Sequence, residues 1–234
     1  MIADEEVWEG EVRDTVEPRA ILSSTPGFSG RIWSVRRDLV QVGSQQVERD
    51  ILLHLGAVAV VALDELDRVL LIRQYRHPVG MSLFETPAGL LDVPGEDPWH
   101  TAQRELAEEA GYRASTWHVL VDMMNSPGGS SEAIRVYLAR DLVEIPGGRE
   151  HTGEAEEDHL PRVWVPLAEA RDLVLGGTLQ NPTTVCGVLA AWAHRELDWH
   201  QLRPADVAWH SRTALVELGR VHGSRGNPEQ AGPA

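Results

Sequence analysis

The segment that decides the fold is GLLDVPGEDPWHTAQRELAEEAGY, residues 89–112. It predicts a loop, then a helix, then a helix stop. Asp97 is suited to the N-cap, and Pro98 follows at the first helical position, where its missing N–H costs nothing. Gly111 stands where a left-handed C-terminal cap is expected. The helix between them would have about 13 residues and measure about 20 Å at roughly 1.5 Å per residue.

Two faces of this predicted helix differ in character. One is apolar and should pack on a core: Trp99, Ala102, Leu106 and Ala110. On another face, Glu105, Glu108 and Glu109 stand at i, i+3 and i+4, so their carboxylates converge. Like charges repel unless a cation neutralises them, and hard divalent cations such as Mg²⁺ take carboxylate oxygens. A solvated acidic face is the alternative. Arg104, four residues before Glu108, could hold a carboxylate in place.

The full stretch resembles the signature of the Nudix hydrolases. That signature is a Gly, five residues, a Glu, seven residues and then Arg-Glu-apolar-x-Glu-Glu-x-Gly-apolar. Here the final part reads Arg104-Glu105-Leu106-x-Glu108-Glu109-x-Gly111-Tyr112, and seven residues separate it from Glu96. Six residues, not five, separate Gly89 from Glu96. The extra residue lies before the helix, so it should bulge the loop without moving the glutamates relative to each other.

Composition limits the function classes. The chain has 234 residues, 42% of them apolar, and a net charge of −15. An acidic surface argues against nucleic acid and against anionic membranes as partners. The single cysteine, Cys186, excludes an internal disulfide and fits a reducing cytoplasm. No signal peptide and no apolar run of about 18 residues is apparent, so a cytoplasmic location without a membrane span is expected.

The expected fold class is α+β, because strands and helices alternate without regular βαβ units. Residues 1–50 predict an N-terminal antiparallel β region, with a weakly alternating strand from Val7 to Val16. This region has too few apolar side chains for a core of its own, so it must lean on the rest of the chain or on a second copy. Residues 51–197 form the predicted catalytic domain, and the resemblance implies an α/β/α sandwich with a mixed sheet. Residues 198–234 read as a partly disordered extension, compatible with one more helix within residues 204–221.

Four further stretches resemble the ADP-ribose pyrophosphatase branch of the family, most closely its actinobacterial members. They are GAVAVVAL (56–63), QYRHPVG (74–80), ETPAGLLD (85–92) and SPGGSSE (126–132). The extra residue in the signature loop is also similar to that group. One departure is Thr86, where the family prefers Leu. The resemblance implies hydrolysis of the diphosphate of ADP-ribose to AMP and ribose 5-phosphate.

The resemblance also implies roles for individual residues. Two or three Mg²⁺ ions, with Mn²⁺ as a possible substitute, would be held by the Ala88 carbonyl together with Glu105, Glu108 and Glu109. Arg76 would contact the phosphates or ribose of the substrate, and Glu85 would hydrogen-bond its adenine side. Glu132 would hold the terminal ribose or a phosphate-bound water. A surface salt bridge is the alternative for Arg76, and an ordinary exposed strand position is the alternative for Glu132.

The general base of this branch lies on the loop before the last strand. That implies Glu156 here, with Glu157 as the next candidate. Relatives of this branch form homodimers that exchange N-terminal strands, and Trp33 and Arg36 could then reach the substrate of the partner. Packing is the alternative for Trp33.

Two other functions remain open from the sequence. One is hydrolysis of a different nucleoside diphosphate sugar, of NADH or of a dinucleoside polyphosphate. The other is a regulator that binds ADP-ribose without cleaving it. Such regulators tend to lose signature glutamates, whereas this chain keeps all of them.

Overall fold

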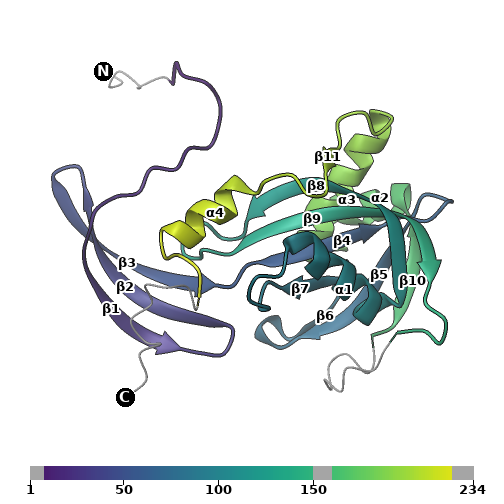
Figure 1. Ribbon diagram of the computed structural model, residues 1–234, viewed down its shortest axis with the longest axis horizontal. Helices are drawn as coiled ribbons and strands as arrows, with labels where there is room; N and C mark the ends of the chain where they lie inside the picture. Colours follow the sequence, from purple (N-terminus) through teal and green to yellow (C-terminus); the bar gives the residue numbers. More distant parts are fainter. Residues whose placement is uncertain (1–7, 150–159, 223–234) are drawn as a thin grey trace.

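The structure, a computed structural model, describes residues 8–149 and 160–222. It is α+β, as the sequence predicts, with a small N-terminal sheet beside a larger layered body (Figure 1). The N-terminal sheet is an antiparallel meander of β1 (Ile21–Ser29), β2 (Trp33–Val42) and β3 (Gln45–His54). The strand predicted from Val7 to Val16 is wrong for the described residues, since residues 8–20 contain no strand and the first one begins at Ile21.

The body contains two sheets. The larger one is mixed and has five strands in the order β11-β8-β9-β4-β7, in which only β4 and β9 run parallel. Its strands are β4 (Ala57–Ala62), β7 (Ala88–Leu90), β8 (Tyr112–Met124), β9 (Ala133–Glu144) and β11 (Arg203–Pro204). The smaller sheet is antiparallel, in the order β10-β5-β6. Its strands are β5 (Arg68–Arg76), β6 (Met81–Glu85) and β10 (Arg162–Pro166), and a short 3₁₀ turn, η1 (His77–Val79), links β5 to β6.

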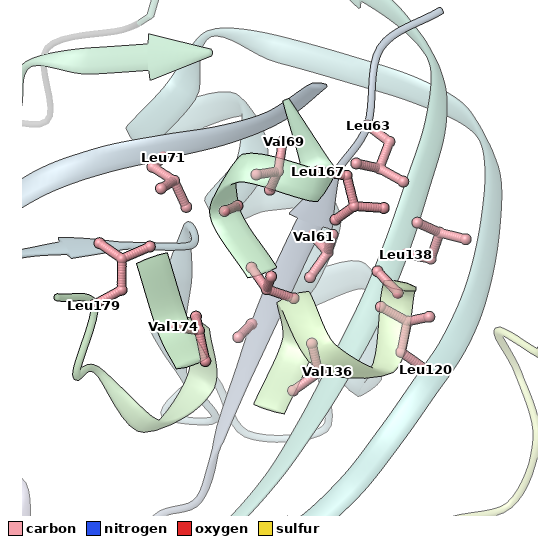
Figure 2. Close-up of a cluster of buried hydrophobic side chains, with 14 of the residues drawn as sticks. Val61, Leu63, Val69, Leu71, Leu120, Val136, Leu138, Leu167, Val174 and Leu179 are labelled. Carbon is pink, nitrogen blue, oxygen red and sulfur yellow. The ribbon is translucent and has the colours of Figure 1, made fainter. Parts of the chain in front are cut away.

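Helices cover both faces of the mixed sheet. The side chains of β4 alternate, as a strand requires: Val58, Val60 and Ala62 pack with α1 (Pro98–Ala110) in one cluster. Ala59 and Val61 point to the other face, where α2 (Leu167–Leu175) and α3 (Pro182–Glu196) close a second cluster (Figure 2). The α/β/α sandwich implied by the resemblance is therefore confirmed.

The signature helix has the predicted limits. Asp97 is the N-cap and accepts a hydrogen bond from the Trp99 amide at 2.8 Å. Gly111 ends the helix with φ of 72°, a left-handed conformation that glycine adopts without strain. Ala102, Leu106 and Ala110 are fully buried, which fixes the rotation of α1 and leaves the glutamates on its other side.

The C-terminal extension is packed on the body as far as residue 222. Buried Arg135 of β9 donates to the carbonyls of Val207 and Ala208 at 2.7 and 3.5 Å, and its guanidinium lies 4.8 Å from the centre of the Trp209 ring. The helix of this region, α4 (His210–Glu217), is shorter than the 204–221 range allowed by the sequence. Arg220 then donates to buried Asp38 of β2 at 3.1 Å, so the extension ties the N-terminal sheet to the body.

Candidate active site

Arg104 is the centre of the charged face of α1. Its guanidinium donates to Glu105 Oε1 at 2.7 Å and to Glu108 Oε2 at 3.2 Å. It also reaches Glu96 in the preceding loop, at 3.2 Å between Nη2 and Oε2. Burial alone would lower the pKa of Arg104, but the hydrogen bond with Glu96 and the charges of Glu105 and Glu108 raise that pKa above its usual value. The predicted positioning role of Arg104 thus has a geometric basis, and it extends to three carboxylates.

Glu96 connects the signature loop to the helix. Its carboxylate accepts from Arg104 and, at 2.8 Å, from the hydroxyl of Thr101, which is fully buried on α1. The hydrogen bond from Arg104 is the first cause that lowers the pKa of Glu96, and Thr101 lowers it further, although burial opposes both. Thr101 is a residue that sequence reasoning missed, since it occupies an unconstrained position of the signature.

Glu105 and Glu109 are almost fully buried and lie against β7. Glu109 Oε2 accepts a hydrogen bond from the Ala88 amide at 2.8 Å. Gly89 packs so closely on Glu105 that a Cβ at residue 89 would lie 2.0 Å from the carboxylate. The structure therefore brings Ala88, Glu105 and Glu109 together. Glu108, three residues after Glu105 in the helix, is more exposed than either of the other two glutamates.

The donor set suits a hard divalent cation. Carboxylates and a backbone carbonyl are the oxygen ligands that Mg²⁺ takes, and the missing Cβ of Gly89 leaves room for the Glu105 carboxylate. Within residues 8–149 and 160–222, no three acidic, His or Cys side chains already converge in a geometry ready for a metal ion. The hydrogen bonds explain this: Arg104 draws Glu105 and Glu108 to itself, while Ala88 holds Glu109. A cation would have to replace part of the charge that Arg104 now supplies.

Arg76 and Glu85, both predicted to contact substrate, contact each other. Arg76 ends β5 and Glu85 ends β6, and their side chains form two parallel hydrogen bonds of 2.9 and 2.7 Å. Glu85 is 1% exposed, whereas the Arg76 side chain keeps 42% of its surface open to solvent. The Glu85 carboxylate therefore orients the guanidinium, and part of the Arg76 side chain remains open to solvent.

Glu132 lies where the 126–132 loop enters β9. Its Oε2 accepts from Asn125 Nδ2 at 2.6 Å, and its Oε1 lies 3.7 Å from His54 Nδ1. The desolvation of His54 lowers the pKa of its imidazole, although the charge of Glu132 opposes the shift. Asn125 is a second residue that the sequence did not single out.

Trp33 and Arg36 lie on β2 in the N-terminal sheet. Arg36 Nε is 3.0 Å from buried Asp38 Oδ1, and the ring of Trp33 lies 5.3 Å from that of Phe28. Both residues thus have partners within their own sheet, and their role toward a second copy stays a prediction.

The base candidates Glu156 and Glu157 lie outside the described residues. The described residues that flank them lie at the C-terminal end of α1. Arg162 donates a hydrogen bond to the Ala110 carbonyl, and the amide nitrogen of Arg149 is 3.0 Å from the Cβ position of Gly111.

Comparison with known proteins matches this site to a family. The NUDIX domain model matches residues 53–183, which include every residue named above for the metal site. An ADP-ribose pyrophosphatase of Mycobacterium tuberculosis is 45% identical over 201 residues, covering 86% of this chain and 95% of that protein.

Two further relatives match at lower identity, and one of them has a different name. A methanol dehydrogenase activator of Bacillus methanolicus is 35% identical over 69% of this chain and 85% of its own length. An ADP-ribose pyrophosphatase of Bacillus subtilis is 35% identical over 63% of this chain and 78% of its own length.

Among solved structures, a crystal structure of an ADP compounds hydrolase superposes with a TM-score of 0.60 at 24% identity. The alignment covers 79% of this chain and 98% of the other, and it supports the fold. Across the described residues, no helix has the length and apolar character needed to cross a membrane.

Proposed function

The chain belongs to the NUDIX family, and on that premise we propose that it hydrolyses the diphosphate bond of ADP-ribose, giving AMP and ribose 5-phosphate, with Mg²⁺ as cofactor. The observation that carries this proposal is the contact of two buried signature glutamates, Glu105 and Glu109, with the Ala88–Gly89 backbone. The choice of substrate is supported by the similarity to two ADP-ribose pyrophosphatases.

In the proposed mechanism, Glu105, Glu108, Glu109 and the Ala88 carbonyl would hold two or three Mg²⁺ ions, and Mn²⁺ suits the same oxygen ligands. Bound there, the metal would neutralise the diphosphate and lower the pKa of a bound water. Arg104 would keep the carboxylates oriented as the charge distribution of the site changes, through its bonds to Glu96, Glu105 and Glu108.

Hydrolysis forms one P–O bond to the attacking water and breaks the bridging P–O bond of the diphosphate. Glu156, or else Glu157, would take a proton from the attacking water as its oxygen forms a bond to phosphorus. The bridging P–O bond breaks on the opposite side. Arg76, oriented by Glu85, would hold the phosphates or the ribose through its guanidinium. Glu132 would hold the terminal ribose or a phosphate-bound water.

We also propose that the active form is a homodimer joined through the N-terminal sheet. β1 is exposed along its whole length, and Phe28 and Trp33 keep 54% and 38% of their surface open to solvent. Aromatic side chains exposed together on one sheet are typical of a protein interface. Trp33 and Arg36 would then approach the nucleotide bound by the partner. Light scattering should give twice the mass of 25.9 kDa, and Phe28→Asp should lower the mass to that of one chain.

The single cysteine supports a reducing compartment, and we propose the cytoplasm. Cys186 is half-buried on α3, and burial raises the pKa of its thiol, which favours a packing role over that of a nucleophile.

The first experiment is an assay of AMP release from ADP-ribose with Mg²⁺, beside ADP-glucose, NADH and diadenosine polyphosphates. Wild type is compared with Glu109→Gln and with the matched control Glu169→Gln, which changes an exposed residue of α2. We expect ADP-ribose to be preferred by more than about tenfold and Glu109→Gln alone to be inactive.

Other outcomes identify the alternatives. Preference for another nucleotide, again with an inactive Glu109→Gln, would retain the metal chemistry and reject ADP-ribose as the substrate. Tight binding of ADP-ribose without turnover of any nucleotide would indicate the non-hydrolytic sensor.

A further inference from the structure

A chain of buried hydroxyl groups joins Thr86 to the N-terminus of α3. The Thr86 hydroxyl donates to Thr183 Oγ1 at 3.4 Å, and Thr183 donates in turn to Asn181 Oδ1 at 2.6 Å. Asn181 is the N-cap of α3 and also accepts from the Thr184 amide at 3.1 Å. Thr86 and Thr184 are fully buried, and Thr183 is 7% exposed, so water does not compete for these bonds.

Thr184 makes a second link to the same segment through its side chain. Its Oγ1 accepts a hydrogen bond from the Thr86 amide at 3.0 Å and lies 3.4 Å from the Phe84 carbonyl. A buried backbone amide needs a partner, and here the partner comes from a residue 98 positions later in the chain. The hydroxyl of Thr184 therefore fixes the backbone between Phe84 and Thr86 against α3.

The backbone that follows contacts the signature glutamates within three residues. The Pro87 carbonyl accepts from the Val60 amide at 2.8 Å, and the Ala88 amide donates to Glu109 Oε2 at 2.8 Å. Gly89 then packs on the carboxylate of Glu105. A displacement of the backbone at Thr86 would be passed on to both carboxylates, because the peptide chain between them is short and in contact with them.

We propose that Thr184, supported by Thr86 and Thr183, is a positioning residue that sets residues 85–89 and, through them, the carboxylates of Glu105 and Glu109. This rests on the proposed function, since it assigns these glutamates to the metal site. None of the three threonines contacts a signature glutamate directly through the hydrogen bonds described above. Their effect passes through the backbone, as it does for groups that orient metal ligands without binding the metal.

The test uses isosteric and conservative changes at Thr184. Thr184→Val keeps the shape and removes the hydroxyl, and Thr184→Ser restores a hydroxyl in a smaller side chain. Mn²⁺ binding is measured by electron paramagnetic resonance without substrate, and kcat and KM are measured separately with Mg²⁺. We expect Thr184→Val to weaken Mn²⁺ binding and to lower kcat/KM by about tenfold or more, and Thr184→Ser to recover most of both.

The matched control is Val188→Ala, one turn further along α3. Val188 is fully buried in the core and has no part in the hydroxyl chain. Val188→Ala should lower the melting temperature and leave Mn²⁺ affinity within about twofold of wild type, since a core cavity costs stability without moving residues 85–89.

The results separate this inference from the proposed function. Wild-type Mn²⁺ affinity and kcat/KM in Thr184→Val, with only a lower melting temperature, would overturn the positioning role. If Thr184→Val does not fold, Thr184→Cys decides against Thr184→Ser, because the two side chains have the same branching and a thiol accepts hydrogen bonds much more weakly than a hydroxyl. Equal Mn²⁺ affinity in these two variants would also overturn the positioning role. A wild type that binds Mn²⁺ but hydrolyses no diphosphate would refute the proposed function, while the Mn²⁺ measurements would still test the positioning role.

Discussion

Gly89 and Glu105 are in contact so close that any side chain at position 89 must displace the Glu105 carboxylate. A Cβ there would lie 2.0 Å from Glu105 Cδ and Oε1, whereas carbon and oxygen atoms without a bond between them stay above 3 Å. Gly89 cannot retreat, because β7 pairs with β4 at Val58 and Glu105 is buried. The extra residue of the loop follows Gly89 in the chain, where Gly95 turns with φ of 81°. The insertion therefore leaves the contact of Gly89 with Glu105 in place.

Gly89→Ala should abolish hydrolysis without unfolding the protein. The added methyl group must push the Glu105 carboxylate away by more than 1 Å, and a misplacement of that size at a reacting centre costs about 100-fold in rate. We expect kcat/KM to fall by about 100-fold or more, measured by AMP release, with an unchanged circular dichroism spectrum.

Gly187→Ala is the control for general crowding. A Cβ at Gly187 would lie 2.7 Å from Val61 Cγ2 in the core, so this variant should lose stability and keep its kcat/KM when folded. Equal activity losses in the two glycine variants would contradict a specific role for Gly89.

Mg²⁺ should stabilise the folded protein through the glutamates of α1. A ligand at about 100 times its Kd adds about 2.7 kcal/mol, which for a chain of this size raises Tm by about 5–10 °C. The rise should disappear in EDTA and in Glu109→Gln, and it should persist in Glu169→Gln, where an exposed residue of α2 changes. Thermal unfolding monitored by fluorescence measures it. A rise of equal size in Glu109→Gln would place the stabilising ion elsewhere.

Local signals made α1 predictable. Asp97-Pro98 and Gly111 set its ends, and the spacing of Ala102, Leu106 and Ala110 set its buried face, all within one stretch of sequence. The convergence of the three glutamates on a second face followed from the same kind of spacing.

Contacts between distant residues were not predictable in the same way. The bond of Arg135 to Val207 spans 72 positions and that of Thr86 to Thr184 spans 98, and neither residue pair belongs to a periodic pattern. The first strand was predicted too early in the chain. Residues 8–16, the described part of that prediction, have no neighbouring strand to pair with, whereas β1 pairs with β2 from Ile21. Tertiary pairing decides strand position more than local propensity does.

Asp122 should make stability depend on acid pH. Burial alone would raise the pKa of Asp122, but hydrogen bonds and charges from Arg135 and Arg203 lower that pKa below its ordinary value of 3.8. The folded state then binds fewer protons than the unfolded state near that pH. The stability that Asp122 contributes is therefore complete above the ordinary pKa and is lost as pH falls from that value through the lower pKa of the folded state. Asp122→Asn should lower the free energy of unfolding by about 2 kcal/mol at pH 7, and by less near pH 3.

Urea unfolding at both pH values measures this difference. Asp172→Asn is the control, because Asp172 forms a surface ion pair with Arg171 on α2. This variant should change the free energy of unfolding by no more than about 0.5 kcal/mol at either pH. A difference for Asp122→Asn that does not shrink on acidification would contradict the linkage.

Arg76 should act on the substrate as well as on Glu85. Arg76→Ala removes both hydrogen bonds to a buried carboxylate, so by itself it cannot separate the two roles. Glu85→Gln keeps the shape of the acid and removes its charge. If the guanidinium of Arg76 holds the phosphates or the ribose, Arg76→Ala made in the Glu85→Gln background should still raise KM by about tenfold, since a charge-assisted hydrogen bond contributes about 1.5–3 kcal/mol. Arg76→Lys in the Glu85→Gln background should have a KM between that of Glu85→Gln and that of the double variant with Ala, because an ammonium group keeps the charge without the paired geometry.

If the double variant with Ala has the same KM as Glu85→Gln alone, Arg76 serves to neutralise Glu85, and the phosphate contact must come from another residue.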